Sequence, residues 1–407
     1  MDCNRDKMFR KLFLVTLLVF ATFASATAQK KEMAQAKAAI KAGKAVEAEA
    51  SMRTLLANPD NRSNEKIWLV LFDAVKKQYE DVNEQMYLKQ STDTAKLFEA
   101  AYRMFCVLEG LDSVDAQPNE NGRVQLKYRR KNAEYLDAYR KNLYIGGSFF
   151  LNKQNYQRAF TLFSAYIDCA EQPLFQSYDY TTKDKRLPSA AFYALYSGYR
   201  ANDPVATLHY KDLAEADTAH LQLTLQYVAD TYRAQGDTIG YVSTLEKGFD
   251  KNPVSEYFFT HLFDYRFQRG DTTQALTLCD RSLAINAKSK VAMLAKSAVL
   301  LTMQHYDECV QLCDAIIALD DSLADAYLNA GLAYFNQAVK IDNAPKHTRA
   351  ERAKMLEFYR NSLKYMQTYR KLAPTRKDLW AMPLYTIYLN LNMGKEFVEM
   401  DAIIKSL

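Results

Sequence analysis

The sequence has 407 residues, of which 49% are hydrophobic and 25% are charged. Lys and Arg together number 53 and Asp and Glu 48, so the formal net charge is only +5. A chain this close to neutral lacks the global basic field with which proteins attract nucleic acid. Nucleic acid is therefore not an expected partner.

The first 28 residues predict a signal peptide of the general secretory kind. A basic start precedes an apolar run at residues 12–23, and Ala26-Thr27-Ala28 has the small side chains of a cleavage site. Cys3 lies before the apolar run, so a lipid anchor is not expected. No later stretch reaches the roughly 20 apolar residues that a membrane span needs. We therefore expect a periplasmic or secreted protein, associated with the cell envelope, with no transmembrane span.

Residues 29–122 predict an N-terminal helical region. An alanine-rich hairpin at residues 29–59 breaks at Gly43-Lys44, and longer helical runs follow at residues 63–111. These longer runs keep no fixed period, so they indicate either a divergent repeat or a packing adapter. Pro118 and Asn119 then mark a surface turn.

Residues 123–323 contain a repeated unit. Gly236-Asp237 recurs 34 residues later as Gly270-Asp271, and Cys279-Asp280 recurs at the same spacing as Cys313-Asp314. Apolar residues at helical spacing lie on both sides of each break, which predicts helical hairpins. Each helix is too short to be stable alone in water, so the hairpins must stack on one another. The predicted architecture is an all-α solenoid of antiparallel helix hairpins.

The last two segments depart from this period. Residues 324–376 predict one repeat with an insertion, in which a break at residues 342–348 separates two long helices. Residues 377–407 predict a capping hairpin that breaks at Met393-Gly394.

The unit resembles the tetratricopeptide repeat (TPR) family, whose 34-residue hairpin has a large residue at position 4, small residues at 8, 20 and 27, and an aromatic residue at 24. Tyr327, Gly331 and Tyr334 match positions 4, 8 and 11 of one repeat. In residues 140–171 the matching residues are Gly147, Phe150, Ala159 and Phe163. Phe263, Cys279 and Cys313 depart from the pattern. The resemblance implies a right-handed superhelix and an exported bacterial TPR protein.

In this family, residues on the first helix of each hairpin line a concave groove that holds a peptide. The resemblance therefore implies an apolar strip on three successive repeats as the partner-binding site. Its members are Tyr257, Phe267, Val291, Leu294, Ala298, Leu301, Leu328, Leu332 and Phe335. The alternatives are that the superhelix closes on itself or that the helices beginning near Ala350 cover the strip.

Three further segments have features beyond the repeat. Residues 123–141 are locally basic, which indicates either a solvated helix face or a surface that meets anions, and residues 346–371 are also locally basic. The polar loop at residues 173–188 is longer than a connection between repeats needs to be. Whether the loop and the basic insertion are functional stays open at this point.

No motif for catalysis, metal binding or a cofactor is present. The five histidines stand apart, and no phosphate loop or nucleophile elbow occurs. The five cysteines outside the leader are an odd number, which leaves a free thiol or an intermolecular bond open, but most lie where a repeat needs a small apolar side chain. We expect no catalytic residue, no metal site and no cofactor.

The hypothesis that follows is a non-catalytic scaffold or adaptor of the bacterial cell envelope, which binds a protein or peptide in the groove. The alternative is a glycan or small-ligand binding protein of an outer-membrane uptake system. An enzyme is disfavoured, and residues 63–121 are the only segment in which it would reside.

Overall fold

The computed structural model describes residues 29–119 and 121–406. The predicted signal peptide lies outside the described residues. Throughout the described part of the chain, the regular elements are α-helices with two short 3-10 helices, η1 and η2. The chain divides into two compact units, one ending at Thr231 and one beginning at Tyr232. This division lies within residues 123–323, for which the sequence predicts repeats.

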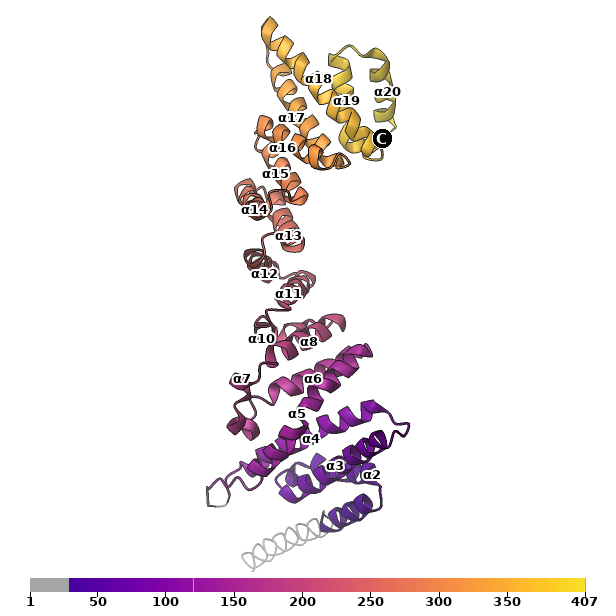
Figure 1. The fold of residues 1–407 in the computed structure, drawn as a ribbon, viewed down its shortest axis with the longest axis vertical. Coiled ribbons are helices and arrows are strands. Elements are labelled where there is room, and N and C mark those ends of the chain that lie inside the picture. Colours follow the sequence, from indigo (N-terminus) through magenta and orange to yellow (C-terminus); the bar gives the residue numbers. More distant parts are fainter. Residues whose placement is uncertain (1–28, 120, 407) are drawn as a thin grey trace, which may run out of the picture. The chain divides into compact units, whose positions relative to one another are not determined.

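In the first unit, helices that follow one another along the chain pack side by side (Figure 1). Residues 29–41 are helical, and α3 and α4 form a long hairpin between α2 and α5. The region from 63 to 111 is therefore a stacked hairpin rather than a separate adapter. The elements are α2 (Ala45–Ala57), η1 (Pro59–Asn61), α3 (Glu65–Tyr87), α4 (Thr94–Asp115), α5 (Arg129–Asn152), α6 (Tyr156–Asp168), η2 (Pro173–Tyr178), α7 (Tyr180–Lys183), α8 (Leu187–Arg200), α9 (Pro204–His209) and α10 (Lys211–Ala214).

The helix α11 (Leu221–Gln235) crosses the division, and the second unit continues the pattern of antiparallel hairpins. Its elements are α12 (Thr238–Lys251), α13 (Glu256–Gln268), α14 (Thr272–Ile285), α15 (Lys290–Thr302), α16 (Tyr306–Leu319), α17 (Ala324–Asp342), α18 (Arg349–Leu372), α19 (Lys377–Asn390) and α20 (Gly394–Lys405). The predicted all-α stack of helix hairpins is confirmed.

The repeated Gly-Asp pair makes the turn between the two helices of a hairpin. Gly236 and Gly270 have φ of 74° and 77°, the left-handed conformation that ends a helix and that glycine adopts without strain. The aspartate that follows each of them accepts a hydrogen bond from a backbone N–H in the first turn of the next helix. In the third copy Gln304 takes the left-handed conformation, with φ of 62°, and His305 makes no side-chain cap. The 34-residue period of the sequence therefore reflects the regular positions at which one helix ends and the next begins.

The small residues at the eighth repeat position lie where two helices touch. A Cβ added to Gly147 would lie 2.8 Å from the Phe163 ring of α6, and one added to Gly331 would lie 2.7 Å from the sulfur of Met366 on α18. A side chain at either position would require the neighbouring side chain to move. The residues that support the family resemblance thus serve the packing that the family requires.

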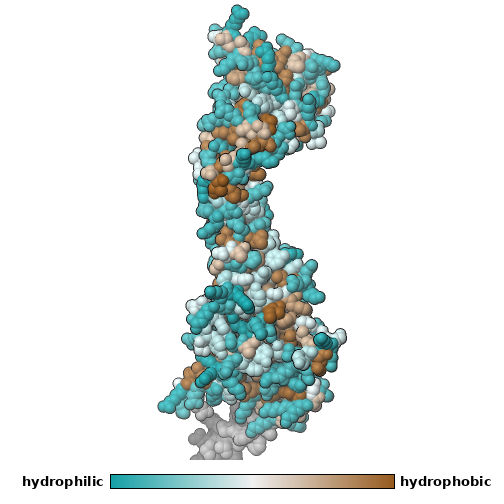
Figure 2. Space-filling model, in the orientation of Figure 1, coloured by the Kyte–Doolittle hydropathy of each residue, from teal (hydrophilic) through white to brown (hydrophobic). Residues whose placement is uncertain are grey.

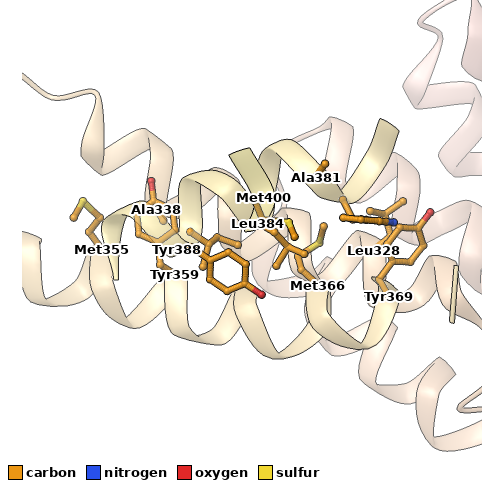
Figure 3. Close-up of a cluster of buried hydrophobic side chains, with 12 residues drawn as sticks. Leu328, Ala338, Met355, Tyr359, Met366, Tyr369, Ala381, Leu384, Tyr388 and Met400 are labelled. Atoms are coloured by element: carbon orange, nitrogen blue, oxygen red, sulfur yellow. The ribbon is translucent and has the colours of Figure 1, made fainter. Parts of the chain in front are cut away.

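The chain ends in a cluster of large buried side chains contributed by α17 to α20 (Figure 3). Trp380, Tyr359 and Tyr369 are almost completely buried there, together with Met366 and Met400. The predicted capping hairpin, α19 and α20, supplies one wall of this cluster. The last hairpins therefore form a closed end with their own core.

The helices α17 and α18, of 19 and 24 residues, are longer than the 13 to 14 residues of α13 to α16. Their common end extends beyond the neighbouring hairpins of the second unit (Figure 1). The break predicted at residues 342–348 is the turn at this end. No helix in the described part of the chain is both long and apolar enough to span a bilayer.

Candidate functional site

Six of the predicted groove residues lie on α13 and α15 and are partly accessible. Val291 is 41% exposed, and Tyr257, Phe267, Leu294, Ala298 and Leu301 are half-buried. We call these six residues the open strip. The Phe267 ring stacks on Phe263 at 5.3 Å, and Leu294 and Leu301 pack against the core of α15 to α17. The open strip is thus held on rigid helices, with its outer surface available to a partner.

The other three predicted groove residues, all on α17, face the C-terminal core. Leu328 is only 9% exposed and belongs to the buried cluster, and Leu332 and Phe335 pack against it. The Phe335 and Tyr359 rings lie 6.1 Å apart. The helices α18 and α19 therefore pack against this part of the strip, although Leu332 and Phe335 stay half-buried. Leu328, Leu332 and Phe335 therefore contribute to the C-terminal core. The sequence pattern alone could not distinguish this packing from partner binding.

Polar side chains flank the open strip. The His261 ring contacts Tyr257 edge-on at 4.5 Å, and Lys296 forms an ion pair with Asp280 at 2.7 Å. Arg266 pairs with Glu246. On the face seen in Figure 2, hydrophobic patches are likewise bordered by hydrophilic residues. The open strip therefore has charged and polar neighbours on its own and adjacent helices.

A cleft of about 830 Å³ lies in the first unit, where the start of α5 meets η2. It brings together two segments that the sequence flagged separately, the basic stretch at 123–141 and the long loop at 173–188. Its volume is in the range of small-molecule sites, roughly 300–1,000 Å³. The lining residues are Leu126, Arg129, Arg130, Ala133, Glu134, Pro173, Leu174, Gln176, Ser177 and Tyr178.

Buried aromatic and charged contacts fix the wall of the cleft. Phe175 of η2 is fully buried and stacks on Phe105 of α4, with the ring centres 5.9 Å apart. The Arg140 guanidinium lies between the Tyr166 and Tyr180 rings, 3.9 and 4.0 Å from their centres. These contacts explain why a segment that reads as a loop is ordered as η2 and α7.

An ion pair ties the end of this segment to α5. Arg140 donates to Asp184 at 2.5 Å and to the backbone carbonyl of Tyr166 at 3.0 Å. Burial alone would raise the pKa of Asp184, but hydrogen bonds from Tyr166, the Arg186 backbone and Arg140 lower it below its usual value. Asp184 is therefore ionised over the whole neutral range, and the ion pair persists there.

The basic stretch at 123–141 is only partly free for a ligand. Arg129 makes two bonds of 2.8 Å to Asp112, and this hydrogen bonding raises the pKa of its guanidinium. Lys127 pairs with Glu65 at 2.8 Å. Arg130, by contrast, is exposed and lines the cleft, as does Tyr178, whose pKa is raised by burial. The cleft thus offers apolar walls, one aromatic ring and both donors and acceptors.

The cysteines are free thiols in the described chain. Cys169, Cys279, Cys309 and Cys313 are buried, and only Cys106 is exposed. Burial raises the pKa of Cys169 and of Cys279 to about 12, so both thiols stay protonated at neutral pH. Among the described residues, no group of three or more His, Cys, Asp or Glu side chains is placed to hold a metal ion.

Solved structures that resemble this chain are helical-repeat proteins at low sequence identity. YrrB, described as a TPR protein with an unusual peptide-binding site, is 19% identical, with 50% of this chain and 98% of that chain covered and a TM-score of 0.34. The C-terminal part of a TPR repeat-containing protein from Cytophaga hutchinsonii is 10% identical, with 63% and 92% covered and a TM-score of 0.41. The human IFIT1 dimer, solved with m7Gppp-AAAA, is 11% identical, with 82% and 73% covered and a TM-score of 0.37. No family profile and no curated protein matches the sequence.

Proposed function

We propose that this chain, which has the tetratricopeptide repeat fold, is a non-catalytic scaffold that holds a segment of a partner protein on the open strip. The observation that carries the proposal is the set of apolar side chains on the accessible face of α13 and α15. The cores of these hairpins are filled by other residues, such as Phe259, Leu262 and Met293. A partner that covered the open strip would gain roughly 25 cal/mol for each Å² of apolar surface removed from water.

The location that we propose is the bacterial cell envelope, outside the cytoplasm. The support is the composition of residues 1–28, with a basic start, an apolar run and a small-residue cleavage site. An exported scaffold would meet envelope proteins, which makes these the first partners to test.

The test compares two glutamate substitutions in the second unit. Val291→Glu places a charge on the open strip, and Ile285→Glu places one at a 61% exposed apolar position of α14 outside it. Both proteins should fold, because both positions face solvent. After mild crosslinking in the native cells, we expect a stoichiometric partner with the wild type and with Ile285→Glu, but not with Val291→Glu. A partner that is retained equally by Val291→Glu would contradict binding at the open strip.

A second candidate function is binding of a glycan or another small ligand in the cleft of the first unit. The observation in its favour is Tyr178, a half-buried ring beside the polar groups of Gln176, Ser177, Arg130 and Glu134. Sugars bind to such combinations of one aromatic face with several hydrogen-bonding groups.

Calorimetry with a panel of glycans tests this candidate. We expect any binding to be lost in Tyr178→Ala and kept in Tyr87→Ala, since Tyr87 is 85% exposed and distant in sequence from the cleft. Heat signals that Tyr178→Ala leaves unchanged would rule out the cleft as the binding site.

A further inference from the structure

The end of the α17–α18 hairpin carries an unusual concentration of positive charge. We call residues 340–354, which comprise the last turns of α17, the connecting turn and the first turns of α18, the hairpin tip. Five cationic side chains lie there, and all of them are exposed. They are Lys340, Lys346, Arg349, Arg352 and Lys354.

The two acidic residues of the hairpin tip are engaged in local hydrogen bonds. Asp342 accepts from the Tyr359 hydroxyl at 3.2 Å. Glu351 accepts from the Thr348 backbone N–H at 2.8 Å and from its hydroxyl at 2.9 Å, in a capping box that opens α18. These bonds lower the pKa of Glu351. Both carboxylates therefore accept hydrogen bonds from residues of the same hairpin.

None of the five cations forms an ion pair with a residue that the structure describes. The ion pairs formed by cations of α18 involve only Arg370, which binds Glu399 far from the tip at 2.6 Å. Elsewhere in the second unit, surface cations such as Lys290 and Arg281 do have acidic partners. The five positive charges of the hairpin tip are thus not neutralised by ion pairs, and their mutual repulsion destabilises the fold.

The hairpin tip has no large exposed apolar side chain. Its exposed uncharged residues are small ones, such as Ala344, Pro345, Ala350 and Ala353. Beneath it Ala338, Met355 and Tyr359 are buried, so the tip is held firmly on the C-terminal core. Apart from the imidazole of His347, residues 340–354 have no aromatic ring on which a base could stack.

We propose that the hairpin tip is a peripheral attachment site for a bilayer that contains anionic lipids. The cations come from both helices and from the turn between them, at one end of the hairpin. A broad anionic surface that meets this end can approach cations of both helices and of the turn together. This inference is independent of the function of the open strip.

The expected strength follows from the number of cations. Each Lys or Arg close to an anionic bilayer strengthens binding about fivefold, and the attraction falls off within a Debye length of about 10 Å at 0.1 M salt. Five cations give reversible binding that depends on salt and on lipid charge. Substitution of three of them should weaken binding on the order of 100-fold or more.

The experiment uses the chain from Gln29 onward and vesicles of phosphatidylcholine with or without phosphatidylglycerol. Lys346→Glu/Arg349→Glu/Arg352→Glu alters the hairpin tip. Arg360→Glu/Lys364→Glu/Lys371→Glu makes the same change of net charge on exposed residues of α18 away from the tip. Glutamate near the start of α18 is favourable for the helix, so the tip variant should fold. Circular dichroism of both variants checks this.

In co-sedimentation at low salt, we expect the wild type and the Arg360 variant to bind vesicles that contain phosphatidylglycerol. The tip variant should bind at least about 100-fold more weakly. Binding should disappear at high salt and with phosphatidylcholine alone. Failure of the wild type to bind anionic vesicles would overturn the proposal, even if an acidic peptide or a nucleic acid bound instead. Equal loss in the two triple variants would also overturn it, because net charge rather than the tip would then be responsible.

Discussion

The nearest neighbour of Gly198 is a backbone atom, whereas that of Gly331 is a side-chain atom. A Cβ on Gly198 would lie 2.5 Å from the backbone nitrogen of Thr207, at the start of α9. A Cβ on Gly331 would meet the side chain of Met366, which is flexible. Both glycines lie at contacts between helices, but substitution by alanine should be tolerated better at Gly331 than at Gly198.

We expect Gly198→Ala to lower the free energy of unfolding by about 2 kcal/mol or more, because a helix backbone must move. Gly331→Ala should cost less than about 1 kcal/mol, since Met366 can rearrange and alanine favours a helix. Guanidinium unfolding followed by circular dichroism measures both. Equal midpoints for the two variants would contradict this distinction.

Glu109 of α4 makes the stability of the first unit depend on pH. Burial, and secondarily the negative charges of Asp168 and Asp112, raise its pKa to about 7 from an ordinary value of 4.5. Between these two values the folded state holds a proton that the unfolded state has lost. Stability therefore falls as pH rises from about 4.5 to 7, and the penalty is complete above 7.

The prediction is that Glu109→Gln is more stable than the wild type at pH 8, by at most about 3 kcal/mol, and differs little at pH 5. Unfolding midpoints at the two pH values provide the measurement. Glu47→Gln, at an exposed position of α2, is the control and should change neither value much. A Glu109→Gln variant that is equally stabilised at both values would show that ionisation is not the cause.

At the scale of the element, two adjacent residues determine where one helix ends and the next begins. Gly270 ends α13 and Asp271 caps α14, and the space around the Gly270 Cα is open. Any cost of a side chain at Gly270 therefore comes from backbone strain rather than from contact. The positions of these breaks were predictable because they depend on local conformational preference alone.

We expect Asp271→Ala to destabilise the second unit by about 1 kcal/mol through loss of the cap, and Gly270→Ala by about 1–2 kcal/mol through strain. Asp307→Ala, on the exposed side of α16, is the control for loss of a carboxylate. Thermal unfolding of the three variants compares them. A control as unstable as Asp271→Ala would mean that charge, and not the cap, determines the effect.

Local sequence preference does not predict the structure of the segment at 173–188. It reads as a polar loop, but η2 and α7 form there because Phe175 inserts against Phe105 and Arg140 lies between two tyrosine rings. These partners are distant in the sequence. The cleft that η2 borders could therefore not be predicted, although both of its walls had been singled out.

At the scale of the whole molecule, each hairpin packs mainly on its neighbours along the chain. Stability in such proteins is close to a sum of local terms, so a defect should remain near its origin. The C-terminal core suits a test of this locality, because Leu384 of α19 is fully buried within it.

We expect Leu384→Ala to cost about 2–5 kcal/mol and to speed amide hydrogen exchange in α18, α19 and α20. Exchange in α3 to α6 of the first unit should be unchanged. Met382→Ala, at a 55% exposed position of the same helix, is the matched control. Mass spectrometry of exchange resolves these regions, and faster exchange throughout the chain would contradict locality.

The sequence by itself determined the helix hairpins, their 34-residue period, the turn residues and the long α17–α18 pair, because these depend on side-chain spacing and on backbone preference within a few residues. Only the tertiary structure decided which core each predicted groove residue packs against. Leu301 and Leu332 are both half-buried members of the same predicted strip, yet Leu301 packs on the core of α15 to α17 and Leu332 on the C-terminal core of α17 to α20. The period of a helix specifies which side a residue faces, but what packs against that side depends on chain segments far along the sequence.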